Sequence, residues 1–485
     1  MSASTTRWTF FVTTLAAFMV SLDNLVVTTA LPEIRTSLGA GISDLEWTVN
    51  AYTLTFGVLL LTGAALGERF GRRRILGIGI ALFTVSSALA ALAPNIETLI
   101  TARAVQGVGG AMILPLTLTL LSNAVAPERR GAALGIWGAV SGLGVAFGPL
   151  IGGAVVDGWA WQWIFWINVP VGILLAPLAL TRLSPERGKA QRLDLPGLGL
   201  VTAGLFGVVW GLVRGNTAGW GSLEVVGSLV AGAIVTTLFV VWEMRSEHPM
   251  LPLRLFRSRG FAASNVTAML FSFGMFGSIF LLAQFLQTVQ GSGPFEAGLK
   301  MLPWTAMPMI VAPLAGPLSD RIGGRPLLVV GLLLQAAGLA WLAGNMSADT
   351  PYSTQWPAFV ISGIGMALFF VPIANVVLGS VPQSDTGVAS GANNAIREIG
   401  GVFGVAVLAA VFSHTGSYAS PQDYADGTSI ATWVGAGVVL AGAIAALFVP
   451  GLKRQAADPA PAADPAQAAD PSPAVAGAVP EPVPA

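Results

Sequence analysis

The feature that most constrains the fold is a succession of long apolar segments that runs through nearly the whole chain. Of its 485 residues, 54% are hydrophobic and only 10% are charged, whereas about a quarter are charged in an average soluble domain. An α-helix needs about 20 apolar residues to cross the hydrocarbon core of a bilayer. We therefore predict an all-α, polytopic membrane protein, with the lipid bilayer as its main partner. Fourteen transmembrane helices are predicted, at residues 8–31, 47–66, 75–93, 98–121, 131–156, 162–181, 195–213, 222–242, 261–284, 295–314, 327–345, 356–379, 388–412 and 431–450.

The basic residues are distributed unevenly between the two sides of these predicted helices. If the N-terminus lies inside, 19 of the 24 Lys and Arg residues fall in inner segments, and Arg35, Arg214 and Lys300 fall at outer positions. Loops rich in Lys and Arg stay on the cytoplasmic side of a membrane. We therefore predict a multi-pass protein of the cell membrane with both termini in the cytoplasm.

The second half of the chain repeats small residues of the first half. A shift of 256 residues aligns Gly107 with Gly363, Gly109 with Gly365, Gly131 with Gly387, Gly144 with Gly400 and Gly148 with Gly404. Internal repeats of this kind are typical of transporters built from two related halves. We therefore predict a six-helix bundle at residues 1–181, two additional spans with cytoplasmic connectors at 182–259 and a second six-helix bundle at 260–450. The tail, residues 451–485, is rich in Ala, Pro and Asp, which predicts a disordered cytoplasmic segment.

The residues needed for several other functions are scarce. The chain has no Cys and only two His, so neither a metal centre nor an enzyme built on these residues is predicted. The net charge is zero and no basic cluster stands out, which gives no indication of nucleic-acid binding. The sequence has no phosphate-binding GxxxxGK motif, so we expect an ion gradient as the energy source and no cofactor. A channel would need repeated filter loops or a symmetric oligomer, whereas this repeat lies within one chain.

Five motifs in the first five predicted spans resemble the major facilitator superfamily and, within it, the fourteen-span drug:proton antiporters. They are SLDNLVVTTALP (21–32), WTVNAYTL (47–54), AALGERFGRRR (64–74), Arg103 with Gln106, Gly107 and Gly109, and Gly148-Pro149 followed by Gly152-Gly153. The third motif has Ala64 and Glu68 where the family has glycine and aspartate. Its second-half counterpart, GPLSDRIGGR (316–325), keeps both of the family's residues.

The resemblance implies a carrier with two pseudo-symmetric six-helix bundles that exports small amphipathic, cationic drugs or antibiotics in exchange for protons. It also implies alternating access, in which the two halves rock about a central site, in a protein that acts as a monomer. An alternative on the same scaffold is a dedicated exporter of one endogenous metabolite or antibiotic. Sodium in place of protons is compatible with the same motifs.

Two charged residues in the first and fourth predicted spans are candidates for proton or substrate coupling, because an ionisable group within a span indicates function. Asp23 lies in the outer half of its span, where a buried carboxylate can bind and release a proton near neutral pH. The alternative for Asp23 is a fixed ion pair or a polar group at a helix end. Arg103 does not deprotonate, so we expect it to tune a neighbouring carboxylate or, alternatively, to contact backbone carbonyls. Its depth is similar to that of Asp23, and the sequence does not determine whether the two touch.

A third candidate lies in the thirteenth predicted span. Glu398 follows Arg397 directly, and adjacent helical residues point about 100° apart, so the two need not pair. Glu398 is therefore either a second protonatable site or one partner of an interhelical salt bridge.

Charged residues at two turns are candidates for a conformational gate. Acidic and basic side chains at a turn form charge pairs and helix-end contacts that can hold the cytoplasmic side shut; otherwise they only anchor the loops inside. The candidates are Glu68, Arg69, Gly71, Arg72, Arg73, Asp320, Arg321 and Arg325.

The fifth predicted span is rich in glycine. Glycines three and four residues apart let helix backbones approach closely, and a proline interrupts the helical hydrogen bonds. We expect either plain packing or a bend and a close interface between spans that shift during transport. The residues concerned are Gly142, Gly144, Gly148, Pro149, Gly152 and Gly153.

Overall fold

The computed structural model describes residues 3–125, 127–184, 194–247, 249–382 and 385–451. Of residues 127–132, 134–135, 139 and 320 it describes the backbone and not the side chain. The described residues form helices and short connections, without a strand among them, which confirms the all-α prediction. The tail predicted to be disordered lies outside the described residues, apart from Gly451.

Fourteen candidate membrane spans are present by length and hydropathy, as the sequence predicts. The α-helices are α1 (Ala3–Leu38), α2 (Ile42–Phe70), α3 (Arg72–Ala91), α4 (Ile96–Ala124), α5 (Pro127–Gly158), α6 (Trp163–Trp166), α7 (Asn168–Arg182), α8 (Leu195–Ala218), α9 (Leu223–Arg245), α10 (Arg259–Thr288), α11 (Pro294–Ile322), α12 (Gly324–Gly344), α13 (Tyr352–Gly379), α14 (Thr386–Thr415) and α15 (Pro421–Ala446). A short 3₁₀ helix, η1 (Leu253–Arg257), precedes α10.

Several helices extend beyond the predicted spans, and one predicted span is interrupted. The span predicted at 162–181 is divided at Ile167 into α6 and α7, because Pro170 in the first turn of α7 has no N–H to donate to the preceding turn. The segment before residue 131, predicted as a loop, is helical from Pro127, and α15 begins at Pro421 rather than near residue 431. Proline is well suited to a first helical turn, where its missing N–H would have no partner. The polar ends of these helices continue beyond the apolar part that the prediction used.

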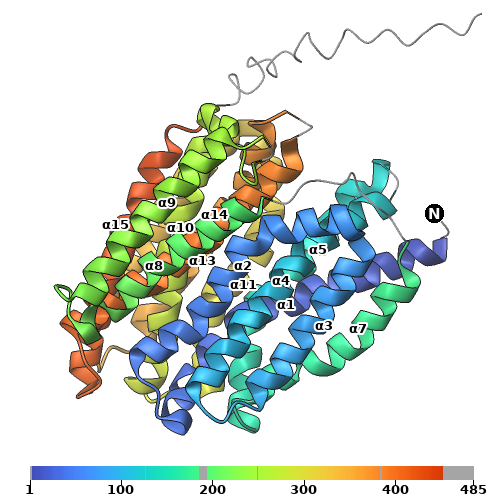
Figure 1. Cartoon of the computed structure of the whole chain (residues 1–485). Helices are drawn as coiled ribbons and strands as arrows, with labels where there is room; N and C mark the ends of the chain where they lie inside the picture. The colour runs from blue at the N-terminus through green and yellow to red at the C-terminus, as the bar shows by residue number, and fades with distance from the viewer. Residues whose placement is uncertain (1–2, 126, 185–193, 248, 383–384, 452–485) are drawn as a thin grey trace, which may run out of the picture.

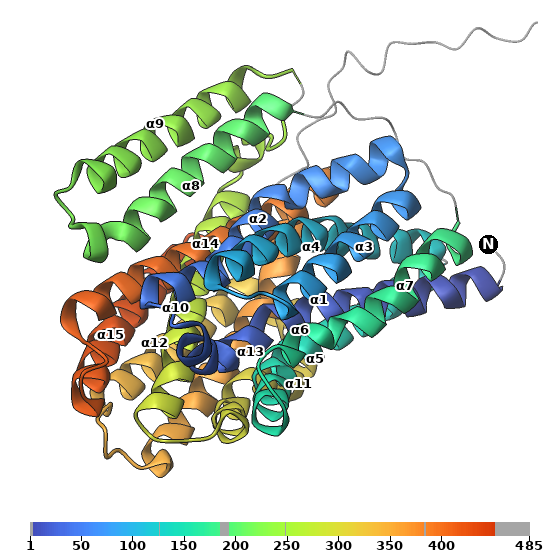
Figure 2. The same cartoon turned by 60° about the horizontal axis from the view of Figure 1, so that its bottom comes forward.

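The helices form two groups of six spans that lie side by side (Figure 1). Within the first group the main contacts are α1 with α5, α2 with α4, and α3 with α4 and α7. Within the second they are α10 with α14 and α15, and α13 with α11 and α12. The two groups meet through α5 against α11, α2 against α14 and α1 against α10. The helices α8 and α9 form a separate hairpin on one flank, as Figure 2 shows, and α8 packs against both α2 and α14.

The glycines of α5 lie at two close interfaces. A methyl group added to Gly144 would come within 2.9 Å of the Leu22 nitrogen of α1, and Gly148 and Gly152 face α1 one and two turns further along. Gly153 faces the start of α11 instead, with an added methyl 2.8 Å from Phe295 Cα. Gly142 has open space around it. The glycine spacing therefore brings α5 against one helix of each group, and Gly142 does not take part.

We expect Gly144→Ala to destabilise the folded protein, although alanine is the better helix former. Its methyl group would meet the backbone of Leu22 and Phe18, each 2.9 Å away, and overpacking of this kind costs about 1–3 kcal/mol. The matched control is Gly142→Ala on the same helix, which gains helix propensity without a clash. Thermal unfolding in detergent should show a lower Tm for Gly144→Ala and an unchanged or higher Tm for Gly142→Ala. Equal Tm values for the two variants would contradict the close packing.

Candidate coupling site

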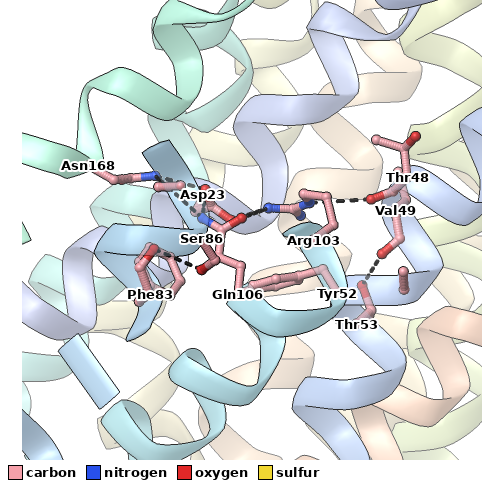
Figure 3. Close-up of polar contacts among 12 residues, drawn as sticks. Asp23, Thr48, Val49, Tyr52, Thr53, Phe83, Ser86, Arg103, Gln106 and Asn168 are labelled. Atoms are coloured by element: carbon pink, nitrogen blue, oxygen red, sulfur yellow. Dashed lines mark hydrogen bonds and ion pairs between the residues drawn. The ribbon is translucent and has the colours of Figure 1, made fainter. Parts of the chain in front are cut away.

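Asp23 of α1 and Arg103 of α4 form an ion pair inside the first group of helices (Figure 3). Arg103 Nη1 donates to Asp23 Oδ2 at 2.5 Å, and the two side chains are 1% and 0% exposed. The sequence places the two at a similar depth, and the structure brings them into contact. A buried charge pair is stable only when both partners have further hydrogen bonds.

Two amide side chains supply these hydrogen bonds to Asp23. Gln106 Nε2 and Asn168 Nδ2 donate to Asp23 Oδ1 at 2.8 and 2.9 Å. Both amides also donate to Ser87 Oγ, at 2.8 and 3.0 Å. The carboxylate of Asp23 is therefore linked to α3, α4 and α7, and each of its oxygens accepts at least one hydrogen bond.

Arg103 is held on its other sides by α2. Its guanidinium carbon lies 4.2 Å from the centre of the Tyr52 ring, its Nε donates to the Thr48 carbonyl at 3.3 Å, and its Nη1 also donates to Gln106 Oε1 at 2.8 Å. Arg103 thus contacts a carboxylate and a backbone carbonyl at once, so the contacts that both alternatives require are present. The Tyr52 hydroxyl is buried without a hydrogen-bond partner in the described part of the chain.

Glu398 is buried on α14 and pairs with its neighbour. Arg397 Nη2 donates to Glu398 Oε1 at 3.1 Å, within the same helix, so the alternative of a salt bridge between helices is wrong. Glu398 Oε2 is buried with no hydrogen-bond partner among the described residues. A methyl group added to Gly57 of α2 would lie 3.0 Å from Glu398 Cβ, which places this carboxyl where the two groups of helices meet. Glu398 is separate from the Asp23 cluster, although both act electrostatically on Tyr52.

The gate candidates of the first half tie neighbouring helices together. Arg72 Nε and Nη2 donate to the two oxygens of Glu68 at 2.6 and 2.9 Å. Gly71 between them has φ +102°, a conformation that favours glycine. Arg73 Nη1 donates to the Leu183 carbonyl at 3.1 Å, after the end of α7, and the guanidinium of Arg69 lies 5.3 Å from the ring centre of Phe70.

The second turn has the same backbone feature. Gly323, between α11 and α12, has φ +87° and corresponds to Gly71 in the repeated motif. Arg321 and Arg325 are exposed. The side chain of Asp320 lies outside the described residues.

A contact between the two groups of helices, which the sequence analysis missed, lies near the end of α1. The Arg35 guanidinium carbon lies 3.7 Å from the ring centre of Tyr418, in the connection between α14 and α15. The Tyr418 hydroxyl donates to Gln284 Oε1 of α10 at 2.9 Å. Burial raises the pKa of Tyr418 to about 12, although the Arg35 charge opposes this rise, so the hydroxyl keeps its proton at physiological pH. Nearby, Gln287 Nε2 donates to the Thr29 carbonyl at 3.0 Å. The available signal was that two of the chain's four tyrosines, Tyr418 and Tyr424, lie close together between the last two predicted spans.

Fourteen candidate spans and a buried polar cluster define a multi-pass helical membrane protein of the carrier type. A family model described as Major Facilitator Superfamily matches residues 13–405 and, in a second match, 264–480. The chain belongs to this superfamily.

Relatives and a solved structure agree with this assignment. The tetracenomycin C resistance and export protein of Streptomyces glaucescens is 34% identical over 86% of this chain and 78% of its own length. The puromycin resistance protein pur8 of Streptomyces alboniger is 36% identical over 93% of both chains. A crystal structure of a POT family transporter in complex with 5-aminolevulinic acid covers 90% of this chain and 94% of its own, with a TM-score of 0.68 and 16% identity. This last similarity concerns the fold alone.

We expect Arg103→Gln to destabilise the protein more than the double variant Asp23→Asn/Arg103→Gln does. The single change leaves Asp23 buried without its cation, a loss of about 3–5 kcal/mol, whereas the double change removes both charges. Thermal unfolding in detergent of the wild type, both single variants and the double variant would measure the coupling. Additive effects of the two single changes would show that the ion pair contributes nothing specific.

We expect Tyr418→Leu to open the contact at the end of α1, and Tyr418→Phe to preserve much of it, because a phenylalanine ring still stacks on Arg35. The absence of cysteine from the sequence allows a reporter at Ala283→Cys, a position with 0% exposure next to Gln284, the residue that accepts from Tyr418. Maleimide labelling of this cysteine should become several-fold faster with Tyr418→Leu and change little with Tyr418→Phe. Equal labelling rates in all three backgrounds would exclude a closing role for Tyr418.

Proposed function

We propose that this transporter exports small amphipathic, cationic drugs or antibiotics in exchange for protons, as a monomer in the cell membrane with both termini in the cytoplasm. The observation that carries the proposal is the buried Asp23–Arg103 pair with its amide donors. The names of the relatives, which describe antibiotic resistance and export, support the direction of transport. Residues 1–181 and 260–450 are proposed as the two halves that rock, with the two additional spans in 182–259.

Asp23 is the proposed proton carrier. A proton on Asp23 removes the negative charge that Arg103 faces, and the loss of that proton restores it. A cationic substrate that approaches the cluster competes with the proton for the same carboxylate, which is the condition for exchange. Arg103 keeps its charge throughout and sets the affinity of Asp23 for the proton.

Glu398 is proposed as a second proton site. Its Oε2 is buried without a partner among the described residues, and its backbone segment packs against Gly57 of α2. A change of charge at Glu398 therefore acts on the contact between α2 and α14, one helix from each half.

The turns at Gly71 and Gly323 are proposed to hold the cytoplasmic side shut in one state. The Glu68–Arg72 pair and the bond from Arg73 to Leu183 fix the first turn. Asp320, Arg321 and Arg325 are proposed to act in the same way at the second turn. The glycine face of α5 gives the close interface along which α1 and α11 can shift.

A dedicated exporter of one compound is the second candidate. The observation in its favour is that the two relatives above are each named for a single antibiotic. The fold and the coupling residues are the same for both candidates, so only the range of accepted substrates separates them.

We expect Asp23→Asn to abolish proton-driven export, because an amide cannot release a proton at physiological pH. Inside-out membrane vesicles with an acidic interior, loaded with a fluorescent cationic dye from outside, should accumulate the dye through the wild type. An uncoupler should abolish the uptake, and Asp23→Asn should reduce it to background at an equal protein level.

The matched control is Asp426→Asn, an exposed carboxylate on α15 that accepts from Gln422; it should transport like the wild type. Full activity of Asp23→Asn would end the coupling role of Asp23. Uptake that is driven by a sodium gradient and is insensitive to the uncoupler would show that sodium, rather than the proton, is the coupling ion. No uptake of any dye by folded protein would favour the dedicated exporter.

A further inference from the structure

The base of the α8–α9 hairpin contains two carboxyl groups that the proposed transport cycle does not use. Asp194 caps the start of α8, where its Oδ1 accepts from the Gly197 nitrogen and from Trp242 Nε1 of α9, both at 2.8 Å. Glu243, one residue further along α9, is 3% exposed. Its Oε2 accepts from the Leu251 nitrogen at 3.0 Å. The two acids thus join the start of α8, the end of α9 and the segment that follows.

The remaining two oxygens of these acids lack a donor. Asp194 Oδ2 and Glu243 Oε1 are both buried, and neither has a hydrogen-bond partner among the described residues. Trp242, which donates to Asp194, directly precedes Glu243, so the two carboxyl groups are neighbours and act on each other electrostatically. Two neighbouring ionised carboxylates repel, and neither can donate a hydrogen bond. One proton between them supplies the missing donor to both, as in other close carboxyl pairs.

The groups around Glu243 offer no described alternative to a proton. Besides Asp194, the groups that act on it are the backbone N–H groups of Met250 and Leu251, which are neutral. Arg245, two residues further along α9, is exposed. The charge of a second carboxylate therefore has no described cation to balance it.

The segment bound by Glu243 also touches the transporter core. Thr62 Oγ1 of α2 donates to the Met250 sulfur at 3.6 Å. Leu251 and Met250 pack against the cluster that contains Leu54 and Val58 of α2. Glu243 is therefore linked through Leu251 and Met250 to α2, the helix that packs against α14.

We propose that Asp194 and Glu243 form a proton-binding site that shares one proton between two carboxyl groups and holds the 249–252 segment against α2. Loss of the proton leaves two negative charges side by side, which pushes Glu243 away from Asp194, separates the ends of α8 and α9 and moves the segment bound to Glu243 through Leu251. The site is independent of the Asp23 cluster, and it gives the two additional spans a role as a pH-sensitive brace.

The test uses an environment-sensitive fluorophore on Leu253→Cys in the full-length, otherwise cysteine-free chain, titrated from pH 5 to 9 in detergent. We expect the fluorescence of the labelled Leu253→Cys protein to show one transition with pH. Glu243→Gln should abolish it and keep the acid-side signal, because the amide donates permanently to Asp194. Asp194→Asn should act in the same way, since asparagine also caps a helix. Controls are Glu224→Gln, an exposed carboxylate of the same helix paired with Arg214, and Asp23→Asn; both should retain the transition.

Thermal unfolding gives a second, label-free measurement. A proton held in the folded state stabilises it at low pH, and this contribution is lost as the pH rises. The Tm of the wild type should therefore fall relative to that of Glu243→Gln as the pH increases. The proposal would be overturned if the labelled protein showed no fluorescence transition. It would also be overturned if Glu243→Gln and Asp194→Asn showed the same transition and the same Tm profile as the wild type.

Discussion

The structure of the first group of helices depends on the burial of one ion pair. Asp23 and Arg103 are almost fully removed from solvent, and a charge in such a setting is stable only with a partner and further hydrogen bonds. The supporting contacts come from helices that are distant in sequence. Asn168 at the start of α7 and Ser87 of α3 supply hydrogen bonds, and Tyr52 of α2 supplies a ring that faces Arg103. The polar cluster therefore ties five helices of this group together at one point.

The glycine face of α5 determines where Asp23 can lie. Leu22, the residue before Asp23, packs against Gly144, and Leu25 packs against Gly148. Larger residues at these positions would push α1 away from α5 and move the carboxylate relative to Arg103. The same helix contacts α11 through Gly153, so the position of Asp23 and the contact between the two halves both depend on α5.

The sequence was sufficient for the spans and for the charged residues inside them, because both stand out against an apolar background. The sequence did not show which residues these charged side chains contact. Asn168, Ser87 and Tyr52 are ordinary polar residues until helix packing brings them to one point. The pairing of Glu398 with Arg397 depends on rotamers rather than on helical spacing. Asp194 and Glu243 are 49 positions apart, at the ends of two predicted spans, where acidic residues are usually solvated. The roles assigned to the coupling, gate and glycine residues remain proposals.

Several hydrogen bonds around Asp23 do not depend on its charge. If Asp23 becomes neutral, Gln106 and Asn168 still donate to Ser87. Arg103 still has the Gln106 oxygen, the Thr48 carbonyl and the Tyr52 ring. Gln106, Asn168 and Arg103 would therefore each keep a hydrogen-bond acceptor, and the loss of every partner is costly for a buried polar group. The change of charge proposed for Asp23 requires such alternative partners.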